Sequence, residues 1–123
     1  MKPEIRKRLC QELSEFFAQR MAISGDMTVK IVDDLILLRC KAALSPGEID
    51  IGAMKAGRRL VQEVSEKTSR ELQPSLNRML NQITGLQLMD VNVAIFWQRK
   101  EKVFLLTMSD SLGNVERKCN EHV

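Results

Sequence analysis

The feature that most constrains the fold is an apolar run between two chain-reversal signals, within residues 32–48. Asp33-Asp34 forms a two-residue turn signal, which would join the strand before it to the run Leu35–Leu38. Glycine is missing from this turn, so its type stays open. Four consecutive apolar residues in a strand place large side chains on both faces of a sheet. A sheet built on this segment therefore needs apolar cover on both sides.

Four strands are predicted, in two hairpins. Residues 28–32 are β-branched and alternate, and they pair across the Asp33-Asp34 turn with the strand that begins at Leu35. Residues 87–97 and 102–108 form the second hairpin, around the polar turn 98–101. In residues 87–97 one face carries Val91, Val93, Ile95 and Trp97, and the other carries Asn92, Ala94 and Phe96.

The second reversal signal is Ser45-Pro46-Gly47-Glu48, which has the form of a capping box. Ser45 would be the N-cap, Pro46 the first helical residue, and the Glu48 side chain would reach back to the Ser45 N–H. The short helix that follows is predicted to end at Gly52.

Two longer helices are predicted. Residues 2–21 carry apolar side chains at helical spacing on one face. Residues 54–84 form a helix of roughly 45 Å, at 1.5 Å per residue. Pro74 lies inside it and is expected to kink or split it, and Gly85 is expected as the residue just past its end.

The element order is therefore α-β-β-α-α-β-β, an α+β fold with a four-stranded, mostly antiparallel sheet. Either one long helix covers each face, or both share a face and a second copy of the chain covers the other. A 45 Å helix overhangs strands of about 20 Å. We favour a homodimer, formed by the overhanging half of the long helix or by the bare sheet face. The predicted interface residues are Leu72, Leu76, Phe96 and Trp97.

Length and composition indicate one soluble domain. The chain has 123 residues, for which we expect a structured core over 3–112 and a tail over 113–123. The net charge is +3, and the basic residues are mixed with acidic ones along the chain. Aromatic residues make up only 4%, so no nucleic-acid partner is expected. No apolar run approaches the ~20 residues of a membrane span, and no signal peptide is visible, so we expect a cytoplasmic protein.

Candidate chemical sites are few. The three cysteines have no metal-ligand spacing, so no metal site and no cofactor are expected. The one histidine is His122, next to the end of the given sequence, so no His-based catalytic site is expected. Arg58-Arg59, near the start of the long helix, could bind an anion; the alternative is that Arg58 holds the end of the preceding helix. Asp33-Asp34 could bind a cation with Asp90, but two acids in a turn more often form only the turn.

Residues 30–48, KIVDDLILLRCKAALSPGE, resemble the hairpin-and-cap segment of the MpsC family. The resemblance continues through Gly57-Arg58 and Leu60-Val61, through residues 71–76, and ends at Ile83-Thr84-Gly85, so that it covers about residues 5–109. Gly47 stands where the family usually has Ala, and residues 54–56 replace a Thr-Pro-Glu sequence. The second departure weakens the N-cap expected at the start of the long helix.

The resemblance implies a component of a sodium-translocating, membrane-potential-generating system. Because the chain has no predicted span, it would act through partners, as a non-enzymatic accessory or regulatory module on a membrane transport complex. The alternative is a small-ligand or nucleotide sensor that uses Arg58-Arg59 and a cleft between the sheet and the long helix. A third hypothesis, an enzyme, requires a pocket in which Cys40, Asp90 or Glu48 converge.

Overall fold

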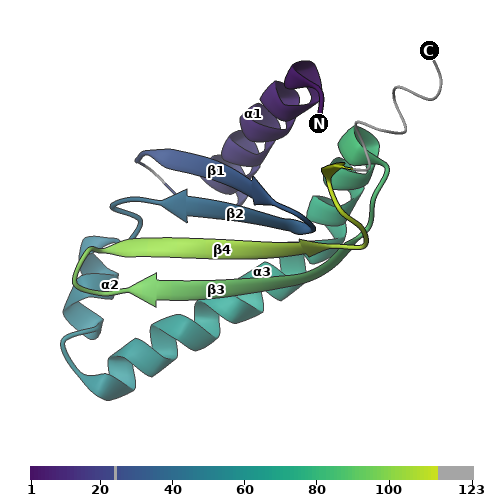
Figure 1. Cartoon of the computed structure of the whole chain (residues 1–123). Helices are drawn as coiled ribbons and strands as arrows, with labels where there is room; N and C mark the ends of the chain where they lie inside the picture. The colour runs from purple at the N-terminus through teal and green to yellow at the C-terminus, as the bar shows by residue number, and fades with distance from the viewer. Residues whose placement is uncertain (24, 114–123) are drawn as a thin grey trace, which may run out of the picture.

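The computed structural model describes residues 1–23 and 25–113 of the chain (Figure 1). Four antiparallel strands form one sheet in the order β1-β2-β4-β3, so the two hairpins join through their second strands. The predicted element order is confirmed. The elements are α1 (Pro3–Arg20), β1 (Met27–Val32), β2 (Leu35–Cys40), α2 (Pro46–Ile51), α3 (Lys55–Thr84), β3 (Leu88–Phe96) and β4 (Glu101–Met108).

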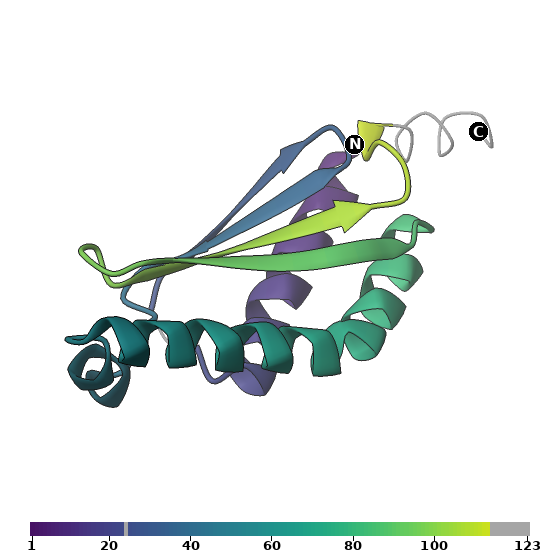
Figure 2. The same cartoon turned by 90° about the horizontal axis from the view of Figure 1, so that it is seen from below.

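The molecule has two layers, a sheet and a layer of helices. Figure 2 shows α1 and α3 on the same side of the sheet, with the other side bare. Of the two arrangements that the sequence left open, the described residues therefore adopt the one in which both long helices share a face. The expected tail lies outside the described residues from position 114 onward.

The core lies between the two layers and draws on alternate residues of each strand. Ile36 and Leu38 of β2 and Phe104 and Leu106 of β4 are fully buried, and they meet Phe17 of α1, whose ring centroid lies 4.7 Å from that of Phe104. Leu9 and Leu13 of α1 and Leu76, Leu80 and Ile83 of α3 complete the helical side. This alternation leaves the intervening strand residues on the side that no helix covers.

The hairpin turn and the short helix form as the sequence predicts. Asp33 has φ 57°, a left-handed conformation that Asp tolerates better than most residues, so glycine is not required. At α2 the Ser45 hydroxyl accepts from the Glu48 N–H at 3.1 Å, and Glu48 Oε1 accepts from the Ser45 N–H at 3.0 Å. Both bonds of the capping box are present. The cap reverses the chain from β2 into the helical layer.

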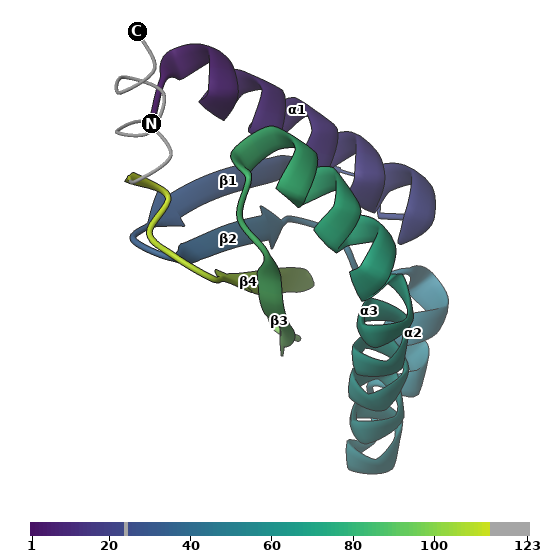
Figure 3. The ribbon, with the colours of Figure 1, turned by 90° about the vertical axis from the view of Figure 1, so that its right-hand side faces the viewer.

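The long helix α3 is continuous through Pro74, so of the two outcomes expected there, a kink or a split, the split does not occur. Figure 3 shows its axis changing direction between an upper part beside α1 and a lower part that runs past α2. The missing Pro74 N–H and the clash of its ring with the preceding turn account for such a bend. Gly85 ends the helix with φ 75°, which confirms the predicted end.

Candidate functional site

The face of the sheet opposite the helices forms a partly apolar surface, which we call the open sheet face. Leu35, Leu37, Val103 and Leu105 form its centre and are only partly buried, because no other element of the described chain packs on them. Phe96 at one end is 41% exposed, and Val32 at the other is 64% exposed. The polar residues on the same face are Thr28, Lys30, Arg39, Asp90, Asn92, Glu101 and Thr107.

One end of the open sheet face carries a two-bond ion pair. Arg39 Nε and Nη2 donate to the two carboxylate oxygens of Glu101, each at 3.0 Å, and the Glu101 side chain is only 8% exposed. Arg99 lies 4.0 Å from the same carboxylate, and its guanidinium lies 5.1 Å from the Phe96 ring centroid. The hydrogen bonds from Arg39 hold the pKa of Glu101 below its usual value. The carboxylate is therefore charged and satisfied within the chain.

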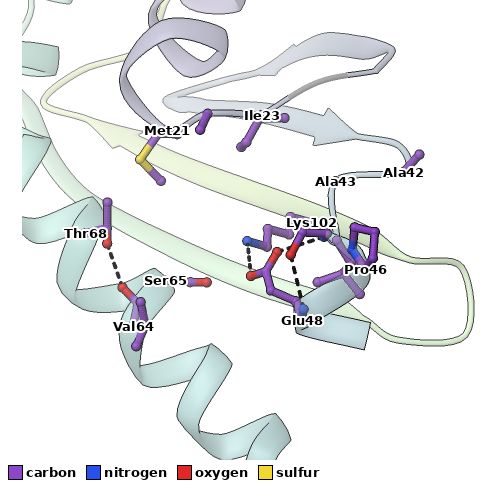
Figure 4. Close-up of a pocket in the computed structure, with 13 residues that line it drawn as sticks. Met21, Ile23, Ala42, Ala43, Pro46, Glu48, Val64, Ser65, Thr68 and Lys102 are labelled. Carbon is purple, nitrogen blue, oxygen red and sulfur yellow. Dashed lines mark hydrogen bonds and ion pairs between the residues drawn. The ribbon is translucent and has the colours of Figure 1, made fainter. Parts of the chain in front are cut away.

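On the helical side lies a second surface, a hollow of about 560 Å³ (Figure 4), which we call the helix-side hollow. Its walls come from segments that are distant in sequence: Met21 to Ile23 after α1, Ala42 to Ser45 before α2, and Val64 to Thr68 of α3. Glu48 and Lys102 line it as well. The hollow lies where α1 has ended, at Arg20, and α3 forms its opposite wall.

The charged pair in the hollow is already matched. Lys102 Nζ donates to Glu48 Oε2 at 3.0 Å, and the Lys102 side chain is 11% exposed. Burial raises the pKa of Glu48, but the bonds from the Ser45 N–H and from Lys102 outweigh it, so the pKa lies below its ordinary value. Glu48 thus both caps α2 and neutralises a lysine on the inner face of β4. It could bind a cation, or Lys102 an anion, only by opening this pair.

Beside the hollow, the N-terminal half of α3 exposes large apolar side chains. Leu60 is 52% exposed, Val64 55% and Met54 72%, and Ile51 at the end of α2 is also exposed. Along the whole helix, large side chains recur at a spacing of four residues, at Leu60, Val64, Thr68, Leu72, Leu76 and Leu80. Of this row, only Leu76 and Leu80 in the C-terminal half are buried, whereas the buried residues of the first half are Val61, Ser65 and Ser69.

The two arginines proposed for an anion site have different surroundings. Arg58 Nε donates to the Gly52 carbonyl at 2.7 Å, and its guanidinium lies 5.4 Å from the Trp97 ring centroid. Arg58 therefore holds the end of α2, as the alternative interpretation had it. Arg59 is exposed, and neither arginine lines the helix-side hollow. A sensor site in the helix-side hollow would therefore not use these two arginines.

Two glycines explain why this corner is so tight. A Cβ on Gly52 would overlap the Trp97 ring, and a Cβ on Gly57 would overlap the backbone carbonyl of Ile51. Gly57-Arg58 thus works as a unit, in which the glycine lets α3 approach α2 and the arginine ties the two together. The sequence pointed to Gly57 only through the family resemblance, whereas Gly52 and Arg58 were also indicated by the residues themselves.

The residues of the enzyme hypothesis are not brought together. Cys40 is fully buried in the core, and burial raises the pKa of its thiol to about 12. Glu48 lies on the helical side, whereas Asp90 is exposed on the open sheet face. Asp33 and Asp34 form the β1–β2 turn, and their carbonyls accept from the Leu112 and Met108 N–H groups. Within residues 1–23 and 25–113, no group of three His, Cys, Asp or Glu could hold a metal ion.

The four predicted interface residues fall in different places. Phe96 is on the open sheet face, and Trp97 packs against Gly52 at the α2–α3 corner. Leu76 is 2% exposed in the core, so it has no surface to offer a partner, and Leu72 is partly buried beside it. Both leucines lie in the C-terminal half of α3, which packs on the sheet and α1, and this packing corrects the prediction for Leu76.

Two parts of the helix-side hollow were not predicted from the sequence: Lys102 and the chain around Ile23. Lys102 lies at a core-facing position of β4, whose other core-facing residues Phe104, Leu106 and Met108 are apolar, and this signal was available from the alternation alone. Ile23 is 4% exposed at the rim of the hollow, and the loop that positions it had no motif to mark it.

A comparison with protein-family models matches residues 1–110 to the family described as "Na+-translocating membrane potential-generating system (MpsC)". The chain belongs to the MpsC family. No curated protein and no solved structure matches it. Among the described residues of this MpsC chain, no helix is both long enough and apolar enough to cross a bilayer. The family links the chain to a membrane potential-generating system. The fold of the chain offers two surfaces, the open sheet face on one side of the sheet and the helix-side hollow on the other.

Proposed function

We propose that this chain is a non-enzymatic accessory module of a sodium-translocating, membrane-potential-generating system. It acts in the cytoplasm as a homodimer and docks on a membrane subunit of that system. The family match supports the link to the system. The docking surface is the exposed apolar part of α3, together with the adjoining helix-side hollow.

The observation that carries this proposal is the exposed apolar stripe on the N-terminal half of α3. Leu60 and Val64 lie one helical turn apart, and each exposes more than half of its surface. Val64 also lines the hollow, so the stripe and the hollow form one continuous surface. Large apolar residues grouped in this way are typical of a site that another protein covers. An apolar segment of the membrane subunit would fit along the stripe.

The test is a pull-down from detergent-solubilised membranes of the native host, with the tagged chain as bait. We expect a membrane subunit to be recovered in stoichiometric amount. The double substitution Leu60→Lys and Val64→Lys should abolish recovery, because it places two charges on the apolar surface. Gln82→Lys adds a charge at an exposed position in the last turns of the same helix and should leave recovery unchanged.

Two results would contradict the proposal. Recovery of no membrane subunit by the wild-type chain would remove the accessory role. Equal recovery by the double variant and by the Gln82→Lys control would keep the role but move the docking surface elsewhere.

A second candidate function, a small-ligand sensor, is favoured by the volume of the helix-side hollow and by Lys102 in its wall. Here a nucleotide would raise the melting temperature of the purified chain. Lys102→Gln should abolish that rise, whereas Arg59→Gln, outside the hollow, should not. No rise with any of the common nucleotides would end this candidate.

A further inference from the structure

The open sheet face has its own internal order. The strand register places its residues in three rows across the sheet, each running β1-β2-β4-β3. The rows are Val32-Leu35-Thr107-Asp90, Lys30-Leu37-Leu105-Asn92 and Thr28-Arg39-Val103-Ala94. The two central strands are apolar in most rows, and the two outer strands are mainly polar.

The two outer strands differ in charge. On this face β1 carries Lys30, whereas β3 carries Asp90 beside Asn92. Asp90 is held in place by its own neighbours, since its carboxylate accepts from the Val91 N–H at 2.9 Å and from Asn92 Nδ2 at 3.1 Å. One edge of the face is thus basic and the opposite edge acidic, on either side of an apolar centre. A surface of this kind is complementary to itself.

We infer that a second copy of the chain covers the open sheet face, with the two-fold axis running along the strands. This inference rests on the homodimer of the proposed function and adds its interface and symmetry. The result is a β-sandwich of two four-stranded sheets, packed about 10 Å apart, with helices on both outer sides.

Charge decides the direction of the axis. An axis along the strands puts β1 over the partner's β3 and β2 over the partner's β4, and it keeps the rows in register. Lys30 then lies over the partner's Asn92. The partner's Asp90 is the next residue along the same face of that strand, so the Lys30 side chain can reach it. An axis across the strands would instead put β1 over the partner's β1 and bring the two copies of Lys30 to the same edge. The first arrangement pairs unlike charges, and the second pairs like charges.

The size of the face sets the expected affinity. Strands about 4.8 Å apart and about 3.3 Å per residue give a face of roughly 19 Å by 23 Å, or about 440 Å² in plan. Together two such faces bury less than the ~1,200 Å² at the lower limit of a standard interface. The side chains that project from each face add some area to this. The dimer should therefore form in a concentration-dependent way.

Sedimentation velocity of the purified chain, from about 1 to about 200 μM, tests this inference. The wild type should shift from monomer to dimer over this range. Leu105→Arg should weaken the dimer at least about tenfold, because it places a charge at the apolar centre. Leu60→Arg makes the same change on α3 and should leave the dimer constant unaltered. Circular dichroism of both variants checks that each is folded.

A charge exchange tests the axis. Lys30→Glu and Asp90→Lys should each weaken the dimer, because each leaves like charges on facing edges. The combined variant should recover most of the affinity, since it restores the pairing with the signs reversed. With an axis across the strands the combined variant would gain nothing, which would overturn the proposed symmetry.

The outcomes separate this inference from the proposed function. A dimer that Leu105→Arg leaves intact would overturn the sandwich and leave the homodimer standing. A wild-type chain that is monomeric throughout would overturn both. The pull-down tests the docking on a membrane subunit independently, because Leu60 and Val64 lie on α3 and this helix lies on the other side of the sheet from the open sheet face.

Discussion

At the scale of single residues, Gly57 decides how closely α3 can follow α2. A methyl group there would meet the Ile51 carbonyl, which is backbone and cannot move aside as a flexible side chain could. We expect Gly57→Ala to lower the free energy of unfolding by about 1–3 kcal/mol, as overpacked positions do. Urea denaturation followed by circular dichroism measures it.

Gly47 is the matched control for that experiment. It lies in the first turn of α2, and a methyl group there would meet nothing within 4 Å. Gly47→Ala should leave the stability unchanged or raise it by up to about 1 kcal/mol, because alanine loses less backbone entropy in a helix. If both substitutions had the same effect, the contact with Ile51 would not be what requires glycine at position 57.

The Arg39–Glu101 pair predicts a pH dependence at the same scale. The folded pKa of Glu101 is lowered, so its charged form stabilises the fold above the ordinary carboxyl pKa of about 4.3. That contribution is lost as the pH falls through the folded value. Glu101→Gln should therefore be less stable than the wild type at pH 7 and should lose less stability on acidification.

Urea denaturation at pH 7 and in mild acid measures how much unfolding free energy the wild type and Glu101→Gln each lose on acidification. Glu63→Gln, at an exposed position of α3, is the control and should lose as much stability on acidification as the wild type. A Glu101→Gln variant with the full wild-type loss would show that other carboxylates carry the acid sensitivity. Glu48 contributes with the same sign, since its pKa is also lowered.

At the scale of elements, the two halves of α3 have different roles. Leu80 is fully buried beneath the sheet, whereas Leu60 is half exposed on the overhanging half. Leu80→Ala should cost about 2–5 kcal/mol of unfolding free energy, and Leu60→Ala less than about 0.5 kcal/mol. Chemical denaturation of both variants measures the difference. Equal costs would mean that the first half of the helix contributes to the core in solution.

The elements themselves were largely predictable, because their signals are local. The Ser45–Glu48 capping box, the Asp33-Asp34 turn and Gly85 each involve bonds or backbone angles within a few residues, and each was placed correctly. The effect of Pro74 was half predictable: the missing N–H is visible in the sequence and indicates a bend, but the sequence does not show whether the helix continues past it.

At the scale of the whole molecule, what the sequence left open was which face each helix covers. Apolar residues on both faces of β2 and β4 require cover, but they do not say whether it comes from this chain or from another. The spacing of four along α3 likewise could not show that Leu76 is buried while Leu60 is not. The helix-side hollow was beyond prediction, because three segments distant in sequence build it.

The packing of the layers also predicts how the molecule opens. Cys40 lies between sheet and helices with no exposed surface and a thiol pKa of about 12, so a thiol reagent should reach it only when the layers separate. In a chain carrying Cys10→Ser and Cys119→Ser, Leu80→Ala should then speed native-state labelling by about 30-fold or more, in proportion to the lost stability. Leu60→Ala should change the rate by less than about threefold. If Leu80→Ala left the rate unchanged, the thiol would be reached through a local opening at the end of β2, and the two layers would not open as one unit.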